Sequence, residues 1–155
     1  MTKSLIITIG LPGSGKSTAI KKCFPKAVVI SPDHISYDDD GHFDVTRLSR
    51  AWKESYARLF SELSWTYDEQ AKTIVFDATN LTPVSRGPLI AAGRHFGFEV
   101  FALHLKVSSE ETKRRNAARS GKDPVPDSVI DIMATKLVEP NAYDPNEFDT
   151  VIPVR

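Results

Sequence analysis

Short runs of apolar residues alternate along the chain with longer segments whose apolar residues recur at helical spacing. Five of these runs, which we predict to be β-strands, cover residues 5–9, 27–30, 73–76, 100–107 and 150–154. Apolar runs separated by helical segments are typical of buried parallel strands with crossover helices between them. The pattern therefore predicts an α/β fold, in which a five-stranded and mostly parallel sheet is flanked by helices.

The longest helix is predicted over residues 45–69, where large apolar residues recur every three or four positions. Such a stripe favours packing against the protein core over a platform for stacking bases. Its members are Val45, Leu48, Trp52, Tyr56, Leu59, Phe60 and Leu63.

Three shorter helices are predicted, two of them from the signals at their starts. Thr82 and Pro83 are typical of the N-cap and the first position of a helix. Ser108 and Glu111 have the spacing of a capping box. The three helices are predicted to cover about residues 82–97, 108–121 and 127–138.

Length and composition indicate one globular domain. The chain has 155 residues, of which 41% are hydrophobic and 26% charged, so we expect residues 1–155 to form a single domain. Cys23 is the only cysteine, and no apolar run is long enough to span a membrane. We therefore expect a cytoplasmic protein without membrane contact. The formal net charge of zero argues against binding of nucleic acid by the whole surface, but it is compatible with a local basic groove.

The stretch GLPGSGKST at residues 10–18 directly follows the first predicted strand and has the spacing of a phosphate-binding P-loop. Its glycines allow positive φ angles, so successive backbone N–H groups can point at one anion. Lys16 can reach the β- and γ-phosphates of ATP from the start of a helix, and Ser17 can offer its hydroxyl to Mg²⁺. The residues expected to bind the nucleotide are Gly10, Pro12, Gly13, Ser14, Gly15, Lys16, Ser17 and Thr18.

Polar residues follow the second and third predicted strands, at the edge where open α/β sheets bind ligands. Asp33 is either a general base for an acceptor hydroxyl or a residue that caps a turn or helix. Asp77 is placed as in a Walker B arrangement, able to hold Mg²⁺ or to orient Ser17, with a capping role as the alternative. Thr79 and Asn80 lie at the same rim and suit an acceptor phosphate or hydroxyl.

Two arginines one helical turn apart lie in the segment ETKRRNAARSGK at residues 111–122. Arg115 and Arg119 are predicted to project from one helix face. Their planar guanidinium groups suit a phosphoryl group whose charge shifts during transfer, and a solvated basic face is the alternative. The polar end of this helix, followed by Gly-Lys-Asp-Pro, favours a lid.

Taken in order, these motifs resemble those of the 5′-hydroxyl polynucleotide kinases of the bacteriophage type and of the kinase modules of polynucleotide kinase-phosphatases. The resemblance covers nearly the whole chain, through GLPGSGKST, Asp33, FDATNLTP followed by Arg86, and KRRNAARSGKDPVPDSV. It implies a P-loop NTPase fold with an arginine-bearing lid. It also implies transfer of the γ-phosphate of ATP, with Mg²⁺, to the 5′-hydroxyl of DNA or RNA.

The resemblance further implies roles for single residues. Asp33 matches the general base, Ser17 matches the Mg²⁺ ligand, and Thr79 matches a contact to the acceptor's phosphate. The residues that match contacts to the transferring phosphoryl group are Lys16, Arg115 and Arg119.

The chain departs from the family pattern at the acceptor site. Ser36 stands where the family usually has an arginine that grips the phosphate next to the reacting nucleoside. Arg86, Lys53 or another basic residue would have to supply this contact to the phosphate. The acidic segment at residues 38–41 is expected to be a solvated turn that repels nucleic acid. Because no Asp-x-Asp-Gly-Thr motif is present, a 3′-phosphatase activity is not expected.

Three functions are compatible with these residues. The leading hypothesis is an ATP-dependent kinase whose partner is a 5′-hydroxyl nucleic acid. The second is a small-molecule kinase that acts on a sugar, nucleoside or antibiotic hydroxyl, and the third is an ATP-binding regulatory or toxin-like module with slow turnover. A GTPase is disfavoured because no Asn-Lys-x-Asp motif occurs.

Overall fold

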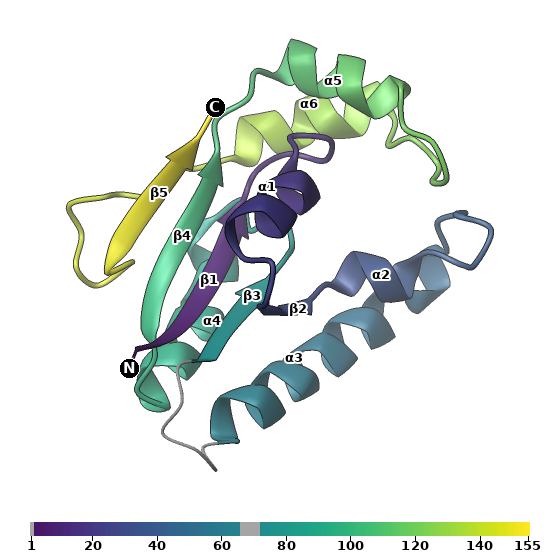
Figure 1. The fold of residues 1–155 in the computed structure, drawn as a ribbon. Coiled ribbons are helices and arrows are strands. Elements are labelled where there is room, and N and C mark those ends of the chain that lie inside the picture. The colour runs from purple at the N-terminus through teal and green to yellow at the C-terminus, as the bar shows by residue number, and fades with distance from the viewer. Residues whose placement is uncertain (1, 66–71) are drawn as a thin grey trace.

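The computed structural model of the protein describes residues 2–65 and 72–155. The strands form one sheet in the order β2-β3-β1-β4-β5, and each neighbouring pair is parallel (Figure 1). The strands are β1 (Lys3–Ile9), β2 (Val28–Ile30), β3 (Lys72–Phe76), β4 (Glu99–Leu105) and β5 (Thr150–Val154). The predicted α/β class and five-stranded sheet are therefore confirmed.

Helices flank this sheet (Figure 1). They are α1 (Lys16–Cys23), α2 (Pro32–Ser36), α3 (Leu48–Ser64), α4 (Pro83–His95), α5 (Ser109–Ala117) and α6 (Asp127–Lys136), and a 3₁₀ turn at Val45–Arg47 precedes α3. The helix predicted over residues 45–69 thus begins as a 3₁₀ turn, and its predicted residues 66–69 lie outside the described residues. The sequence pattern does not predict α2, which is too short to show a period. Within residues 2–65 and 72–155, no helix combines the length and apolar character needed to cross a membrane.

Alternate residues of β1 enter two hydrophobic layers, one on each face of the sheet. Leu5, Ile7 and Ile9 pack in a layer with side chains of α3 and α4, whereas Ile6 packs in a layer with side chains of α1. Successive side chains of a strand point to opposite faces, so both faces of this central strand are buried. Burial on both sides explains why the strands appear in the sequence as continuous apolar runs.

The apolar stripe of α3 is only partly in the core. Leu59 is fully buried, and the ring of Trp52 packs on Phe76 with 5.9 Å between centroids. In contrast, the side chains of Leu48 and Phe60 are 37% and 48% exposed. The prediction of a core stripe therefore holds for some of its members and not for others.

The predicted helix starts at Thr82 and Ser108 are confirmed. The Thr82 hydroxyl accepts the N–H of Ser85 at 3.2 Å, and the Ser85 hydroxyl accepts the N–H of Thr82 at 3.3 Å, which makes a reciprocal capping box. The Ser108 hydroxyl accepts the N–H of Glu111 at 3.2 Å. The Glu111 carboxylate does not complete a box and instead accepts from arginine side chains of its own helix.

Candidate active site

A cleft of about 990 Å³ opens at the carboxyl ends of the strands, the edge where open α/β sheets bind ligands. Its walls come from the loop before α1, from α2, the first turns of α3, the segment after β3, and α5 with the segment that follows it. The cleft brings together most of the residues that the sequence singles out. They are Pro12, Gly13, Ser14, Gly15, Lys16, Ser17, Thr18, Asp33, Asp77, Thr79, Arg115 and Arg119.

The loop at residues 10–18 has the conformation expected of a phosphate cradle. Gly13 and Gly15 have φ angles of +81° and +93°. Gly10 differs from the prediction, because it is needed for space and not for a positive φ: a Cβ atom there would lie 2.7 Å from the Oγ of Ser14. Helix α1 begins at Lys16 without a side-chain cap, so its first N–H groups and the positive end of its dipole are available to an anion.

The side chain of Lys16 lies against this loop. Its ammonium donates to the carbonyls of Gly10 at 3.1 Å and Leu11 at 2.8 Å. Burial lowers the pKa of Lys16, and the carboxylates of Asp77 and Asp33 oppose this shift. Because an ammonium has three N–H donors, it can also donate to a phosphate oxygen.

Asp77 directly follows β3, lines the cleft and is only 6% exposed. The hydroxyl of Thr8 lies 3.3 Å from its Oδ1. Burial raises the pKa of Asp77, and the charge of Lys16 opposes this shift. Ser17 is exposed and lines the same cleft.

A carboxylate and a hydroxyl fit the needs of Mg²⁺, which keeps several waters and uses few protein ligands beside nucleotide phosphates. Ser17 and Asp77 supply this donor set. The described part of the chain contains no cluster of three or more His, Cys, Asp or Glu that could hold a metal alone. A site completed by nucleotide phosphates is therefore the kind that these residues can build.

Helix α2 presents Asp33 to the cleft. Asp33 lies in the first turn of this helix, and its carbonyl accepts the N–H of Tyr37 at 3.2 Å. Its side chain is exposed, and its charge acts on both Lys16 and Asp77. Asp33 thus lies in the first turn of α2 and also lines the cleft. Its role as a general base stays a prediction.

Arg115 reaches the cleft from α5. Its Nε donates to the Glu111 carboxylate at 2.7 Å, and its Nη1 lies 3.4 Å from the carbonyl oxygen of Ser14 in the P-loop. Hydrogen bonds from Arg114 and Arg115 lower the pKa of Glu111 to about 2. Glu111 therefore stays ionised at neutral pH and orients the Arg115 guanidinium beside the phosphate cradle.

Sequence reasoning missed Asn116, which shapes the segment after α5. Asn116 is 1% exposed, and its amide donates to the Val125 carbonyl at 2.6 Å and accepts the Val125 N–H at 3.0 Å. Its Oδ1 also lies 3.5 Å from Nη1 of Arg119. The two bonds to Val125 close the segment at residues 118–124, which we call the lid segment because the sequence predicts a lid there. No local signal marks this asparagine, because its main partner lies nine residues later.

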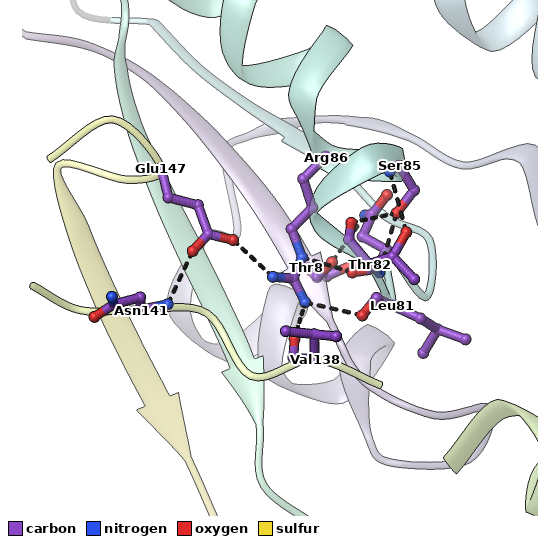
Figure 2. Close-up of polar contacts among 9 residues, drawn as sticks. Thr8, Leu81, Thr82, Ser85, Arg86, Val138, Asn141 and Glu147 are labelled. Carbon is purple, nitrogen blue, oxygen red and sulfur yellow. Dashed lines mark hydrogen bonds and ion pairs between the residues drawn. The ribbon is translucent and has the colours of Figure 1, made fainter. Parts of the chain in front are cut away.

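Arg86 does not reach the cleft, so the expected acceptor contact is wrong. The side chain is fully buried, and Figure 2 shows its guanidinium directed at backbone carbonyls and at Glu147. Nε donates to the Asn80 carbonyl at 2.8 Å, and Nη1 donates to Glu147 at 2.7 Å. Nη2 donates to the carbonyls of Leu81, at 3.1 Å, and Val138. Arg86 therefore ties the start of α4 to two segments near the C-terminus.

Two other residues that the sequence places at the acceptor site also lie outside the cleft. Ser36 is fully buried, and its hydroxyl donates to the Pro32 carbonyl at 3.0 Å. Asn80 is 2% exposed at a φ of +44°, which asparagine tolerates, and its amide donates to the Thr8 carbonyl at 2.8 Å. Lys53 is exposed on α3 but does not line the cleft, so it does not replace the missing arginine.

The acidic segment at residues 38–41 is not the free turn that its sequence predicts. Asp39 and Asp40 are exposed, but Gly41 is buried, and its carbonyl accepts the N–H of Asp123 at 2.8 Å. The Nδ1 atom of His42 lies 3.3 Å from the Asp123 carboxylate, which raises the pKa of His42. The loop after α2 therefore contacts the lid segment across the cleft.

Replacing Arg86 by methionine is expected to lower the free energy of unfolding by about 3–5 kcal/mol, because the change leaves Glu147 and three carbonyls without their buried donor. Lys53→Met, on an exposed face of α3, is the control and should change stability by less than about 0.5 kcal/mol. Urea unfolding of both variants measures the difference. An Arg86→Met protein of native stability that binds acceptor weakly would instead give Arg86 a substrate role.

Comparison with known proteins supports the P-loop fold. The AAA_33 family, described as an AAA domain, matches residues 5–140. Kti12 from Chaetomium thermophilum, in complex with ADP-AlF3, is 19% identical over 97% of this chain and 88% of that chain, with a TM-score of 0.65. A gluconokinase from Sinorhizobium meliloti 1021 is 18% identical over 97% and 81%, with a TM-score of 0.58. A chain of the Pnkp1/Rnl/Hen1 RNA repair complex is 22% identical over 88% and 44%, with a TM-score of 0.68.

Proposed function

Since this chain belongs to the AAA_33 family of P-loop proteins, we propose that it transfers the γ-phosphate of ATP to the 5′-hydroxyl of DNA or RNA. One observation carries the proposal: the exposed carboxylate of Asp33 shares a cleft with Lys16 of the P-loop and with Arg115 and Arg119. A hydroxyl placed beside Asp33 would lie next to a phosphate held by the P-loop. This is the arrangement that transfer between the two requires.

The P-loop and α1 would bind the donor. Backbone N–H groups at the start of α1 would hold the phosphates of ATP, and Lys16 would add positive charge at the β- and γ-phosphates. Ser17 and Asp77 would hold Mg²⁺, which neutralises charge on those phosphates when it is bound.

Asp33 would act as the general base. It accepts the proton of the 5′-hydroxyl while the hydroxyl oxygen bonds to the γ-phosphorus, and the bond to the bridging oxygen breaks to release ADP. Arg115 and Arg119 would stabilise the charge on the non-bridging oxygens. Glu111 supports this role by fixing the Arg115 guanidinium in advance.

The acceptor's own phosphates would meet few cationic groups. None of the residues that α2 and the first turns of α3 contribute to the cleft is a lysine or an arginine. Thr79 and Lys122 line the cleft and are available to these phosphates. The acceptor would thus be bound by several weak contacts along the strand and not by one strong contact to a single phosphate.

We expect kcat/KM to rise with acceptor length and to fall with added salt. A nucleoside 3′-monophosphate should be at least about tenfold poorer than a long strand, because each charge-assisted contact is worth about 1.5–3 kcal/mol. Transfer of labelled γ-phosphate to acceptors of increasing length, at two salt concentrations, measures this. Equal kcat/KM for the monophosphate and the long strand would show that a single strong contact binds the phosphate next to the reacting nucleoside.

Transfer to the hydroxyl of a small molecule is the second candidate. The lack of basic side chains on the α2 and α3 side of the cleft favours it, because an uncharged acceptor needs no cation there. Sugars and nucleosides therefore belong in the same assay. A labelled sugar phosphate, without any labelled oligonucleotide, would replace the first proposal by the second.

A further inference from the structure

Four large side chains form an apolar wall of the cleft near Asp33. They are Tyr37, Phe43, Leu48 and Trp52, and we call them the apolar wall. Phe43 and Leu48 are 45% and 37% exposed, so packing in the core does not account for them. Apolar side chains gathered in a cleft next to a few polar groups are typical of a ligand subsite.

Local contacts hold the apolar wall in place before any ligand binds. Tyr37 and Phe43 face each other across an isolated antiparallel bridge, with 5.5 Å between their ring centroids. The N–H of Asp44 donates to the Ser36 carbonyl at 2.9 Å and closes the loop between them. The ring of Trp52 packs on Phe76, which belongs to the core. A wall ordered in this way lowers the entropic cost of binding.

Tyr37 of the apolar wall lies about one helical turn from the proposed base. Tyr37 follows Asp33 by four residues, and its N–H donates to the Asp33 carbonyl at 3.2 Å. Tyr37 directly follows α2, and its hydrogen bond to Asp33 keeps the two residues one helical turn apart, a spacing at which Cβ atoms are about 5–6 Å apart. The 5′-hydroxyl and the base of a nucleoside are separated by one sugar ring, which spans a comparable distance. An acceptor whose hydroxyl meets Asp33 would therefore bring its base to Tyr37.

On the premise of the proposed function, we propose that the apolar wall is the subsite for the base of the acceptor's 5′-terminal nucleotide. Every base has flat faces on which aromatic side chains stack with little regard to sequence. The side chains of Phe43 and Leu48 offer no hydrogen-bond partner to the hydroxyl groups of a sugar acceptor. The apolar wall thus selects a nucleotide end over a polyol and does not select among bases.

Tyr37 also links this subsite to the lid segment. The ammonium of Lys122 lies 4.8 Å from the centroid of its ring. The N–H of Phe43 donates to the carboxylate of Asp123 at 3.2 Å. A base on the apolar wall therefore lies beside the segment that carries Arg119.

Two 5′-hydroxyl oligonucleotides of equal length test the subsite, one complete and one lacking only the base of its first residue. The native protein is expected to show a kcat/KM about tenfold or more lower for the abasic strand, since stacking on that base is lost. Phe43→Ser should remove most of this difference. Phe60→Ser is the matched control, because Phe60 is 48% exposed on α3 and does not line the cleft, and it should keep the difference.

Equal kcat/KM for the two strands with the native protein would overturn the subsite, and so would full discrimination by Phe43→Ser. If neither strand is phosphorylated, the proposed function fails, and binding then decides on the subsite alone. The chain has two tryptophans, so the fluorescence of a Trp65→Phe variant reports on Trp52. With ADP saturating the P-loop, adenosine should quench this fluorescence and ribose should not. Absence of quenching by adenosine would overturn the subsite.

Discussion

Lys16→Ala is expected to lower the rate of phosphoryl transfer by several orders of magnitude, on the order of 10³-fold or more, while the protein stays folded. The Lys16 ammonium lies among the P-loop carbonyls and near Asp77, and no other lysine lines this part of the loop. Its loss removes positive charge where negative charge builds up during transfer. Single-turnover rates with saturating ATP measure the effect directly.

The control for this variant is Lys21→Ala. Lys21 is an exposed lysine in the last turn of the same helix and does not line the cleft. It should retain the native transfer rate, and circular dichroism should show native helix content for both variants. A folded Lys16→Ala protein with a near-native rate would remove the P-loop from the proposed chemistry.

Asp33→Asn is expected to lower kcat by about 10²-fold or more and to leave ATP binding nearly unchanged. Asparagine keeps the shape of the side chain but cannot take the proton of the acceptor hydroxyl. Asp33 is exposed in α2, outside the P-loop, so its amide should not disturb the nucleotide site. Transfer rates and the Kd for ATP, measured on the same protein, separate the two effects.

Asp39→Asn is the matched control, since it removes one exposed carboxylate from the loop that follows α2 and does not alter the cleft lining. Its kcat should be that of the native protein. If Asp33→Asn were equally active, Asp33 would have only its role at the start of α2, and another group would have to accept the proton.

The strands and the P-loop could be predicted from the sequence because their signals are local. Burial of β1 on both faces requires a continuous apolar run, and the cradle requires glycine at residues 13 and 15 to reach positive φ. The cleft position of Asp33 follows from the rule that parallel strands end at one edge of the sheet.

The direction of Arg86 could not be predicted, because its partners are set by tertiary structure. Glu147 lies 61 residues away in the chain, and the remaining acceptors are backbone carbonyls that no side chain identifies. The motif placed Arg86 correctly after β3, but the start of α4 turns its side chain inward.

The two ends of the α3 stripe differ for a similar reason. Leu59 packs in the core against the sheet, whereas Leu48 lines the cleft. Helical spacing shows that residues share one face of a helix, but it does not show how far the sheet extends along that face. The apolar wall could therefore be recognised only once the positions of α2 and α3 were known.

Transfer to the 5′-hydroxyl itself can be measured with one pair of strands. Two oligonucleotides of identical sequence, one with a 5′-hydroxyl and one with a 5′-phosphate, are incubated with γ-labelled ATP, Mg²⁺ and the native protein. We predict label only on the 5′-hydroxyl strand, released as the 5′-mononucleotide of the first residue after nuclease digestion. Label on both strands, on neither strand, or at any position other than the 5′ end would contradict it.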